Sequence, residues 1–133
     1  MRLAARCAGI AMAGPAIGSA QAACLKANTP DQVIEGRLTS VRISIPDYKL
    51  KRQASILRVA SDACLEGGGG EFDKVERTNR IHVFAMDDAL RKRLRSLEGR
   101  PVRITGEPFG EHTAHHHAPM VLRVARIEPA GPR

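Results

Sequence analysis

The sequence is poor in aromatic residues, since its 133 residues include no tryptophan, one tyrosine and three phenylalanines. Proteins that bind single-stranded nucleic acid stack the bases on aromatic side chains, so we expect no nucleic acid ligand. Acidic residues are also the minority, with 14 aspartates and glutamates against 21 lysines and arginines. The net charge of +7 suits an anionic partner, which outside the cytoplasm is an acidic protein or an anionic envelope component. A soluble surface with excess arginine explains the same charge without any partner.

Long hydrophobic runs are missing except near the N-terminus. Residues 7–18 are uncharged and rich in Ala, Ile and Met, and they lie between two arginines and the small-x-small sequence Ala20-Gln21-Ala22. This order is typical of a secretory signal peptide. A transmembrane helix needs roughly 20 apolar residues, which this stretch does not reach. We therefore expect a signal peptide over residues 1–22, a periplasmic or secreted protein, and no transmembrane segment in the mature chain.

Cysteines are few, and the expected cleavage near Ala22 would also remove Cys7. The mature chain would keep Cys24 and Cys64, an even number in an oxidising compartment, and so we expect a disulfide between them. In the chain-entropy account a loop of this size contributes about 4 kcal/mol. Lipoprotein anchoring at Cys24 is the alternative, because small residues precede it, although Gln21 stands where such signals usually have leucine. A lipidated Cys24 could not pair with Cys64.

Hydrophobic periodicity predicts five strands and one helix. The helix begins at Asp87 or Asp88, either of which can cap its N-terminus, and it ends before Gly99. In the first strand the alternation changes phase at Thr39-Ser40, which predicts a β-bulge that bends a long strand. A charged loop is expected over residues 46–53. The strands are expected over residues 33–45, 54–67, 80–86, 101–109 and 120–129.

This order of elements, with one helix between the third and fourth strands, is that of an OB-fold, a small five-stranded β-barrel. We therefore predict a mainly β protein with one helix, organised as a single OB-like domain over residues 23–129 with a tail at residues 130–133. An open α+β sheet is the alternative. The connection between the last two strands lies at an edge of the OB-fold that commonly binds ligands.

That connection, in the sequence "GEHTAHHHAPM", holds four of the five histidines. In extended backbone His115 and His117 would point to one face and His116 to the other. Two imidazoles could then meet one ion, with His112 and His82 as further candidate ligands. Histidine clusters suit Zn²⁺, Cu²⁺ or Ni²⁺ and not Ca²⁺ or Mg²⁺. One alternative is a structural hydrogen-bond network, and another is a pH switch, because imidazoles titrate between pH 5 and 8.

No nucleophile, general base or phosphate-binding motif stands at a spacing that supports catalysis. We therefore expect no enzymatic activity. The leading hypothesis is a secreted or periplasmic binding module that binds a transition metal through the histidine loop from His112 to His117. The alternative is a module that binds a protein or an envelope polymer through its basic surface, with the histidines in a structural role.

Several features together resemble one protein family. Cys24 is followed by leucine, the first predicted strand contains "EGRLTSV", and the second ends at Cys64. The stretch from Leu97 to Gly106 fits the pattern Leu-x-Gly-x-x-Val-x-x-x-Gly, and "HTAHHHAPMVLRV" fits an HTxHHHxPVxLxV-like run. The chain thus resembles the secreted bacterial proteins of domain of unknown function 4431, over most of its mature length. It departs from them in the loop "PDYKLKRQ", which is shorter and more basic than is usual. The resemblance implies a secreted barrel with a disulfide, and no established activity.

Overall fold

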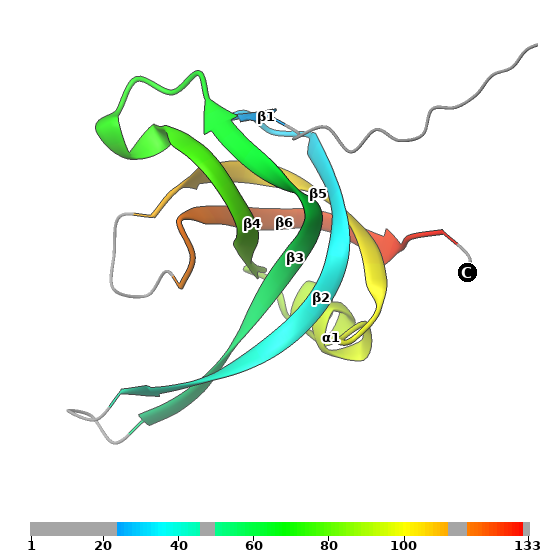
Figure 1. Cartoon of the computed structure of the whole chain (residues 1–133). Coiled ribbons are helices and arrows are strands. Elements are labelled where there is room, and N and C mark those ends of the chain that lie inside the picture. The colour runs from blue at the N-terminus through cyan, green and yellow to red at the C-terminus, as the bar shows by residue number, and fades with distance from the viewer. Residues whose placement is uncertain (1–23, 46–49, 112–116, 132–133) are drawn as a thin grey trace, which may run out of the picture.

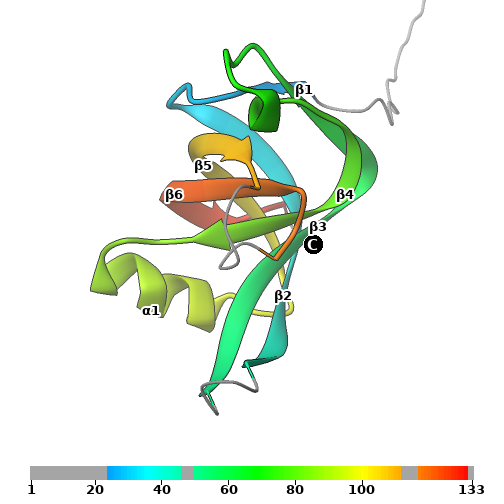
Figure 2. The same ribbon diagram turned by 90° about the vertical axis from the view of Figure 1, so that its left-hand side faces the viewer.

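The computed structural model describes residues 24–45, 50–111 and 117–131, and it contains a five-stranded mixed β-barrel with one short helix and an extra strand (Figures 1 and 2). The mainly β prediction is therefore confirmed. The elements are β1 (Cys24–Lys26), β2 (Gln32–Ile45), β3 (Leu50–Glu66), a 3₁₀ turn (Glu71–Asp73), β4 (Val75–Phe84), α1 (Asp88–Ser96), β5 (Pro101–Gly110) and β6 (Met120–Pro129).

Strand pairing closes the barrel in the order expected for an OB-fold. β2, β3 and β4 form an antiparallel meander, and β4 then pairs in parallel with β6. β6 pairs antiparallel with β5, and β5 returns to β2. Because β2 and β4 each have a partner on both sides, the alternative of an open sheet is wrong. The closing pair of β4 and β6 joins the segment around His82 to the segment that follows the histidine loop.

The barrel interior is filled by alternate residues of the strands, and α1 covers one end of it (Figure 2). Leu94 and Leu97 are buried, which confirms the helical spacing predicted for this segment. The Asp87 carboxylate accepts a hydrogen bond from the backbone N–H of Leu90 at 2.7 Å and so caps the helix. Gly99 has a φ of 83°, which ends the helix as expected. The fully buried strand residues include Leu38, Leu57, Ile81, Ile104 and Leu122.

The predicted β-bulge at Thr39-Ser40 is wrong, because β2 keeps one register against β3 over residues 37–45. The hydrophobic residues change phase there for a different reason. Leu38 faces the barrel interior, but β2 pairs with β5 only as far as Arg37. β3 stays paired with β4 as far as Ser55, which lies opposite Ser40. From Val41 onward β2 and β3 continue as a two-stranded ribbon that leaves the barrel (Figure 1), so the opposite face becomes the apolar one.

Two strands begin more than one residue away from their predicted starts. β3 begins at Leu50, so part of the predicted loop over residues 46–53 is strand, paired with the end of β2. β4 begins at Val75, five residues before the predicted start at Arg80, because the sequence "VERTN" is mostly polar and shows no apolar alternation. Neighbouring strands supply backbone hydrogen bonds to such a segment whatever its hydropathy.

The extra strand, β1, is absent from the sequence prediction. It lies parallel to β3, with Cys24 opposite Cys64. A disulfide joins these two cysteines, as expected. The predicted signal peptide over residues 1–22 and the end of the predicted tail lie outside the described residues. Within the described ranges no helix is long and apolar enough to cross a membrane.

Gly106 lies at a shift of register between β5 and β6, where a Cβ atom would overlap the carbonyl oxygen of Arg123. Gly106→Ala is therefore expected to lower the free energy of unfolding by about 1–3 kcal/mol, because the backbone of β6 must move. Urea denaturation measures the change. Gly69→Ala is the matched control, since a Cβ there meets nothing within 4 Å, and it should stay within about 0.5 kcal/mol of wild type. Equal losses in both variants would contradict the close approach at Gly106.

Candidate functional site

The structure describes two of the five histidines, and it brings them together from distant parts of the chain. His82 is buried in β4, and His117 is half-buried at the end of the loop that leads into β6. Their ring centroids are 5.2 Å apart with planes inclined by 47°. The other three candidate ligands, His112, His115 and His116, lie outside the described residues.

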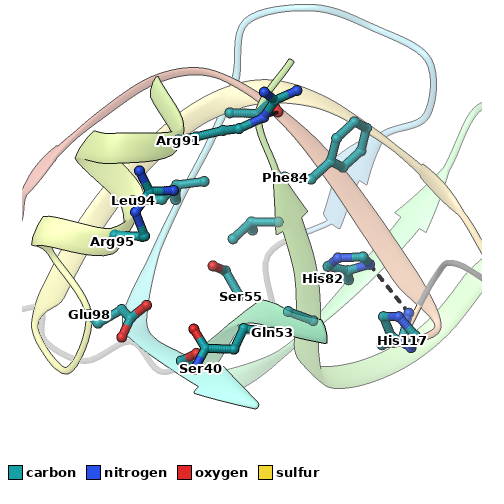
Figure 3. Close-up of a pocket in the computed structure, with 13 residues that line it drawn as sticks. Ser40, Gln53, Ser55, His82, Phe84, Arg91, Leu94, Arg95, Glu98 and His117 are labelled. Carbon is teal, nitrogen blue, oxygen red and sulfur yellow. Dashed lines mark hydrogen bonds between the residues drawn. The ribbon is translucent and has the colours of Figure 1, made fainter. Parts of the chain in front are cut away.

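His117 is held to β4 through both polar groups of its backbone. Its N–H donates to Nδ1 of His82 at 3.3 Å (Figure 3), and its carbonyl oxygen accepts from the guanidinium of Arg80 at 3.2 Å. Arg80 and His82 are two residues apart on one strand and therefore point to the same side of the sheet. Two side chains of β4 thus fix the last residue of the histidine loop against the barrel.

This hydrogen bond determines the tautomer of His82. An Nδ1 atom that accepts a hydrogen bond carries no proton, so the neutral ring must carry its proton on Nε2. A histidine that binds a metal ion uses one unprotonated nitrogen and usually donates a hydrogen bond from the other. In the arrangement described, His82 has its unprotonated nitrogen facing the backbone of His117. It therefore positions that residue.

Rings continue along the sheet from this pair. His82 and Phe84, two residues apart on β4, have ring centroids 6.2 Å apart. Phe84 in turn contacts Phe109 of β5 edge to face, with centroids 6.2 Å apart and planes inclined by 81°. His117, Phe84 and Phe109 are each half-buried, so the rings form a partly accessible aromatic strip on the outer surface of the barrel.

Two hollows flank His117. A pocket of about 380 Å³ lies between α1, β4 and the adjoining parts of β2 and β3 (Figure 3). A groove of about 450 Å³ lies over the apolar face of the ribbon. Both volumes are within the range of small-ligand sites. The pocket has the polar residues Ser40, Gln53, Ser55, Arg95 and Glu98, and the groove has Val41, Ile43, Ile56, Arg80 and Glu111.

The basic face of α1 offers the pocket less available positive charge than the number of its arginines suggests. The guanidinium of Arg91 donates to the carbonyl oxygens of Ala85 and Met86, at 3.1 and 3.0 Å, and pairs with Asp88 at 2.7 Å. Arg91 therefore secures the turn between β4 and α1. Arg95 also lines the pocket, and it forms no ion pair with any residue that the structure describes.

No group of three or more His, Cys, Asp or Glu side chains within the described ranges is placed to hold a metal ion. The ligand roles predicted for His112, His115, His116 and His117 therefore stay predictions. Sequence reasoning missed Arg80, which anchors His117 from 37 positions away along the chain. No local pattern could have revealed it, because the contact exists only once β4 and β6 pair.

Residues 80–128, just over a third of the chain, match the family model described as "Domain of unknown function (DUF4431)". This confirms the resemblance for the segment from Arg80 in β4 to Glu128 in β6. The matched segment contains both described histidines, Arg80 and the whole of α1. Comparison with curated proteins finds none that matches the chain.

Proposed function

We propose that the protein is a non-enzymatic binding module of the bacterial cell envelope that holds a transition-metal ion with the histidines of its 112–117 loop. The observation that carries this proposal is the attachment of His117 to β4 through His82 and Arg80. A ligand that is fixed before the ion arrives loses less conformational entropy on binding. Three further histidines precede His117 within five residues, so one fixed and several adjacent imidazoles are available for Zn²⁺, Cu²⁺ or Ni²⁺.

In this proposal the candidate His82 acts as a positioning residue, because its Nδ1 already accepts from the backbone of His117. The proposed ligands are then His117 and His115, with His112 or His116 to complete the site. Secretion through the N-terminal segment would place the module outside the cytoplasm, with the mature net charge reduced to +5 after the loss of Arg2 and Arg6.

The test is metal content and affinity, measured on untagged protein by elemental analysis and by competition titration with Zn²⁺ and Cu²⁺. Wild type is expected to hold one ion at nanomolar affinity, and His115→Ala/His117→Ala to bind at least 100-fold more weakly. His82→Gln is the matched control, because its amide oxygen can still accept from His117. It should weaken binding by no more than about tenfold, the lower end of the range for residues that support a ligand.

Two results would count against this proposal. If binding is only micromolar and survives His115→Ala/His117→Ala, the histidines are not a physiological metal site. If His82→Gln loses the metal as completely as the double variant does, then His82 is itself a ligand and the hydrogen bond to His117 must open when the ion binds.

A second candidate function is a module that binds a protein or an envelope polymer through its basic surface, with the histidines in a structural role. The hydrogen bonds that join the backbone of His117 to His82 and Arg80 also favour this function, because they hold the loop at His117 without any ion. It predicts capture of an anionic partner that weakens steeply with added salt. Capture that is absent or insensitive to salt would count against it.

A further inference from the structure

Three arginines lie directly opposite one another on three adjacent strands of the barrel. The register pairs Arg37 of β2 with Arg58 of β3, and Arg58 with Arg80 of β4. Residues paired in this way point to the same face, with Cβ atoms about 5 Å apart. All three side chains are exposed. We call Arg37, Arg58 and Arg80 the arginine row; it crosses β2, β3 and β4, which lie side by side in Figure 1.

Two residues earlier on β2 than Arg37, the same sheet pairs its charges differently. There Glu35 lies opposite Arg103 of β5, and Arg103 lies opposite Glu128 of β6. The charges alternate and are joined, at 2.8 Å from Arg103 Nε to Glu35 and 3.7 Å from Arg103 to Glu128. The hydrogen bond from Arg103 to Glu35, with the charge of that carboxylate, raises the pKa of the guanidinium above its ordinary value. Alternation is thus available to this sheet, and the arginine row departs from it.

Within the described part of the chain, no carboxylate forms an ion pair with any member of the row. Arg37 donates to the carbonyl oxygen of Gly99 at 2.6 Å, and Arg80 to that of His117 at 3.2 Å. Each of these bonds uses one nitrogen and orients a guanidinium whose other N–H groups remain as donors. Glu111 lines the same groove as Arg80, but no ion pair joins them. Like charges placed directly opposite each other lower the stability of a sheet. An anionic ligand bound to the row would reduce this repulsion.

We propose that the arginine row binds an acidic polysaccharide that lies across β2, β3 and β4 and presents one anionic group to each guanidinium. Neighbouring strands are about 4.8 Å apart, so the row offers three charges over roughly 10 Å. That spacing suits an extended polymer with regularly repeated charges better than a single small ion. Arginine also binds carboxylate and sulfate through paired hydrogen bonds.

The surroundings of the row favour a sugar chain over nucleic acid. In an OB-fold the outer face of the second and third barrel strands, here β3 and β4, is a frequent site for oligosaccharides and oligonucleotides. Phe84 lies on the same face of β4 as Arg80, and its half-buried ring offers a surface for the sugars. Base stacking needs more aromatic side chains than the chain contains, with three phenylalanines, one tyrosine and no tryptophan.

This inference rests on the second candidate function and is independent of a bound metal. It is therefore tested on full-length mature protein stripped of metal with a chelator. The probes are polygalacturonate for a carboxylate on each sugar, dextran sulfate for sulfate groups, neutral dextran, and single-stranded poly-dT. Affinities are measured by titration calorimetry at two salt concentrations, so that a failure here leaves the metal test unaffected.

The informative variant is Arg58→Gln, which removes the central charge of the row. The matched control is Arg126→Gln, an equal charge change at an exposed arginine of β6 that forms no ion pair with any described residue. We expect polygalacturonate or dextran sulfate to bind, neutral dextran not to bind, and Arg58→Gln to weaken binding at least tenfold while Arg126→Gln changes it less than twofold. Thermal unfolding of Arg58→Gln should occur at the same temperature as wild type or higher, because a like-charge contact is removed.

Three outcomes would overturn the proposal. Equal weakening in Arg58→Gln and Arg126→Gln would mean that general charge, and not the row, attracts the polymer. Absence of binding to both acidic polysaccharides at low salt would remove the ligand class. Binding of poly-dT that is tighter than that of either polysaccharide, and that depends on Arg58, would make the row a nucleic acid site.

Discussion

Replacement of both Cys24 and Cys64 by alanine is expected to lower the free energy of unfolding by about 4 kcal/mol, the chain-entropy contribution of a disulfide that closes a loop of this size. For a domain of this length the loss corresponds to a fall in melting temperature of roughly 15 °C. The effect is large because β1 has only three residues, all paired with β3 beside the disulfide. Without the bond, this short parallel pair must order the N-terminal segment unaided. Denaturation in urea, followed by circular dichroism, measures the change.

Reduction provides the control for the disulfide. A thiol reductant should bring wild type close to the stability of the double variant and leave the variant unchanged. A double variant within about 1 kcal/mol of wild type would show that the bond contributes little, a result that native-state strain can produce. Thiol labelling of mature protein from its own host separates the two fates of Cys24, since lipid anchoring there would leave Cys64 free to react.

Leu38→Ala is expected to destabilise the protein by about 3 kcal/mol, within the range of 2–5 kcal/mol for removal of a buried leucine side chain. Leu38 has no exposed surface and stands where β2 leaves the barrel. Its backbone N–H donates to Arg100 at 3.0 Å, and its carbonyl oxygen accepts from Gly99 at 2.6 Å. Its backbone thus holds the connection between α1 and β5 against β2, and its side chain belongs to the same core cluster as Leu94 and Leu97.

Val33→Ala is the matched control for Leu38→Ala, because Val33 lies five residues earlier on β2 with 49% of its surface exposed. It should change the free energy of unfolding by no more than about 0.5 kcal/mol. Both variants are compared by urea denaturation under identical conditions. A loss below about 1 kcal/mol in Leu38→Ala would mean that the end of the barrel repacks freely, and the pocket beside α1 would then be a poorly defined site.

Only part of the candidate site could be predicted from the sequence. The crowding of histidines is visible in a short segment, and His82 is the only other histidine of the chain. The hydrogen bond from the backbone of His117 to His82 could not be predicted from the sequence around either residue. Residues 82 and 117 meet because β4 and β6 pair in parallel, and parallel pairing of distant segments leaves no local pattern.

The sequence by itself determined the five barrel strands, the helix and their order along the chain. Apolar alternation marked the five barrel strands, Asp87 and Gly99 marked the ends of the helix, and the cysteine count indicated the disulfide. Such features depend on neighbours along the chain, where side-chain spacing and backbone preference act directly. Only the tertiary structure decided which side chains of different strands lie opposite one another. A shift of one residue in register would send Arg58 to the other face of β3, and the arginine row exists because long-range pairing aligns residues 37, 58 and 80.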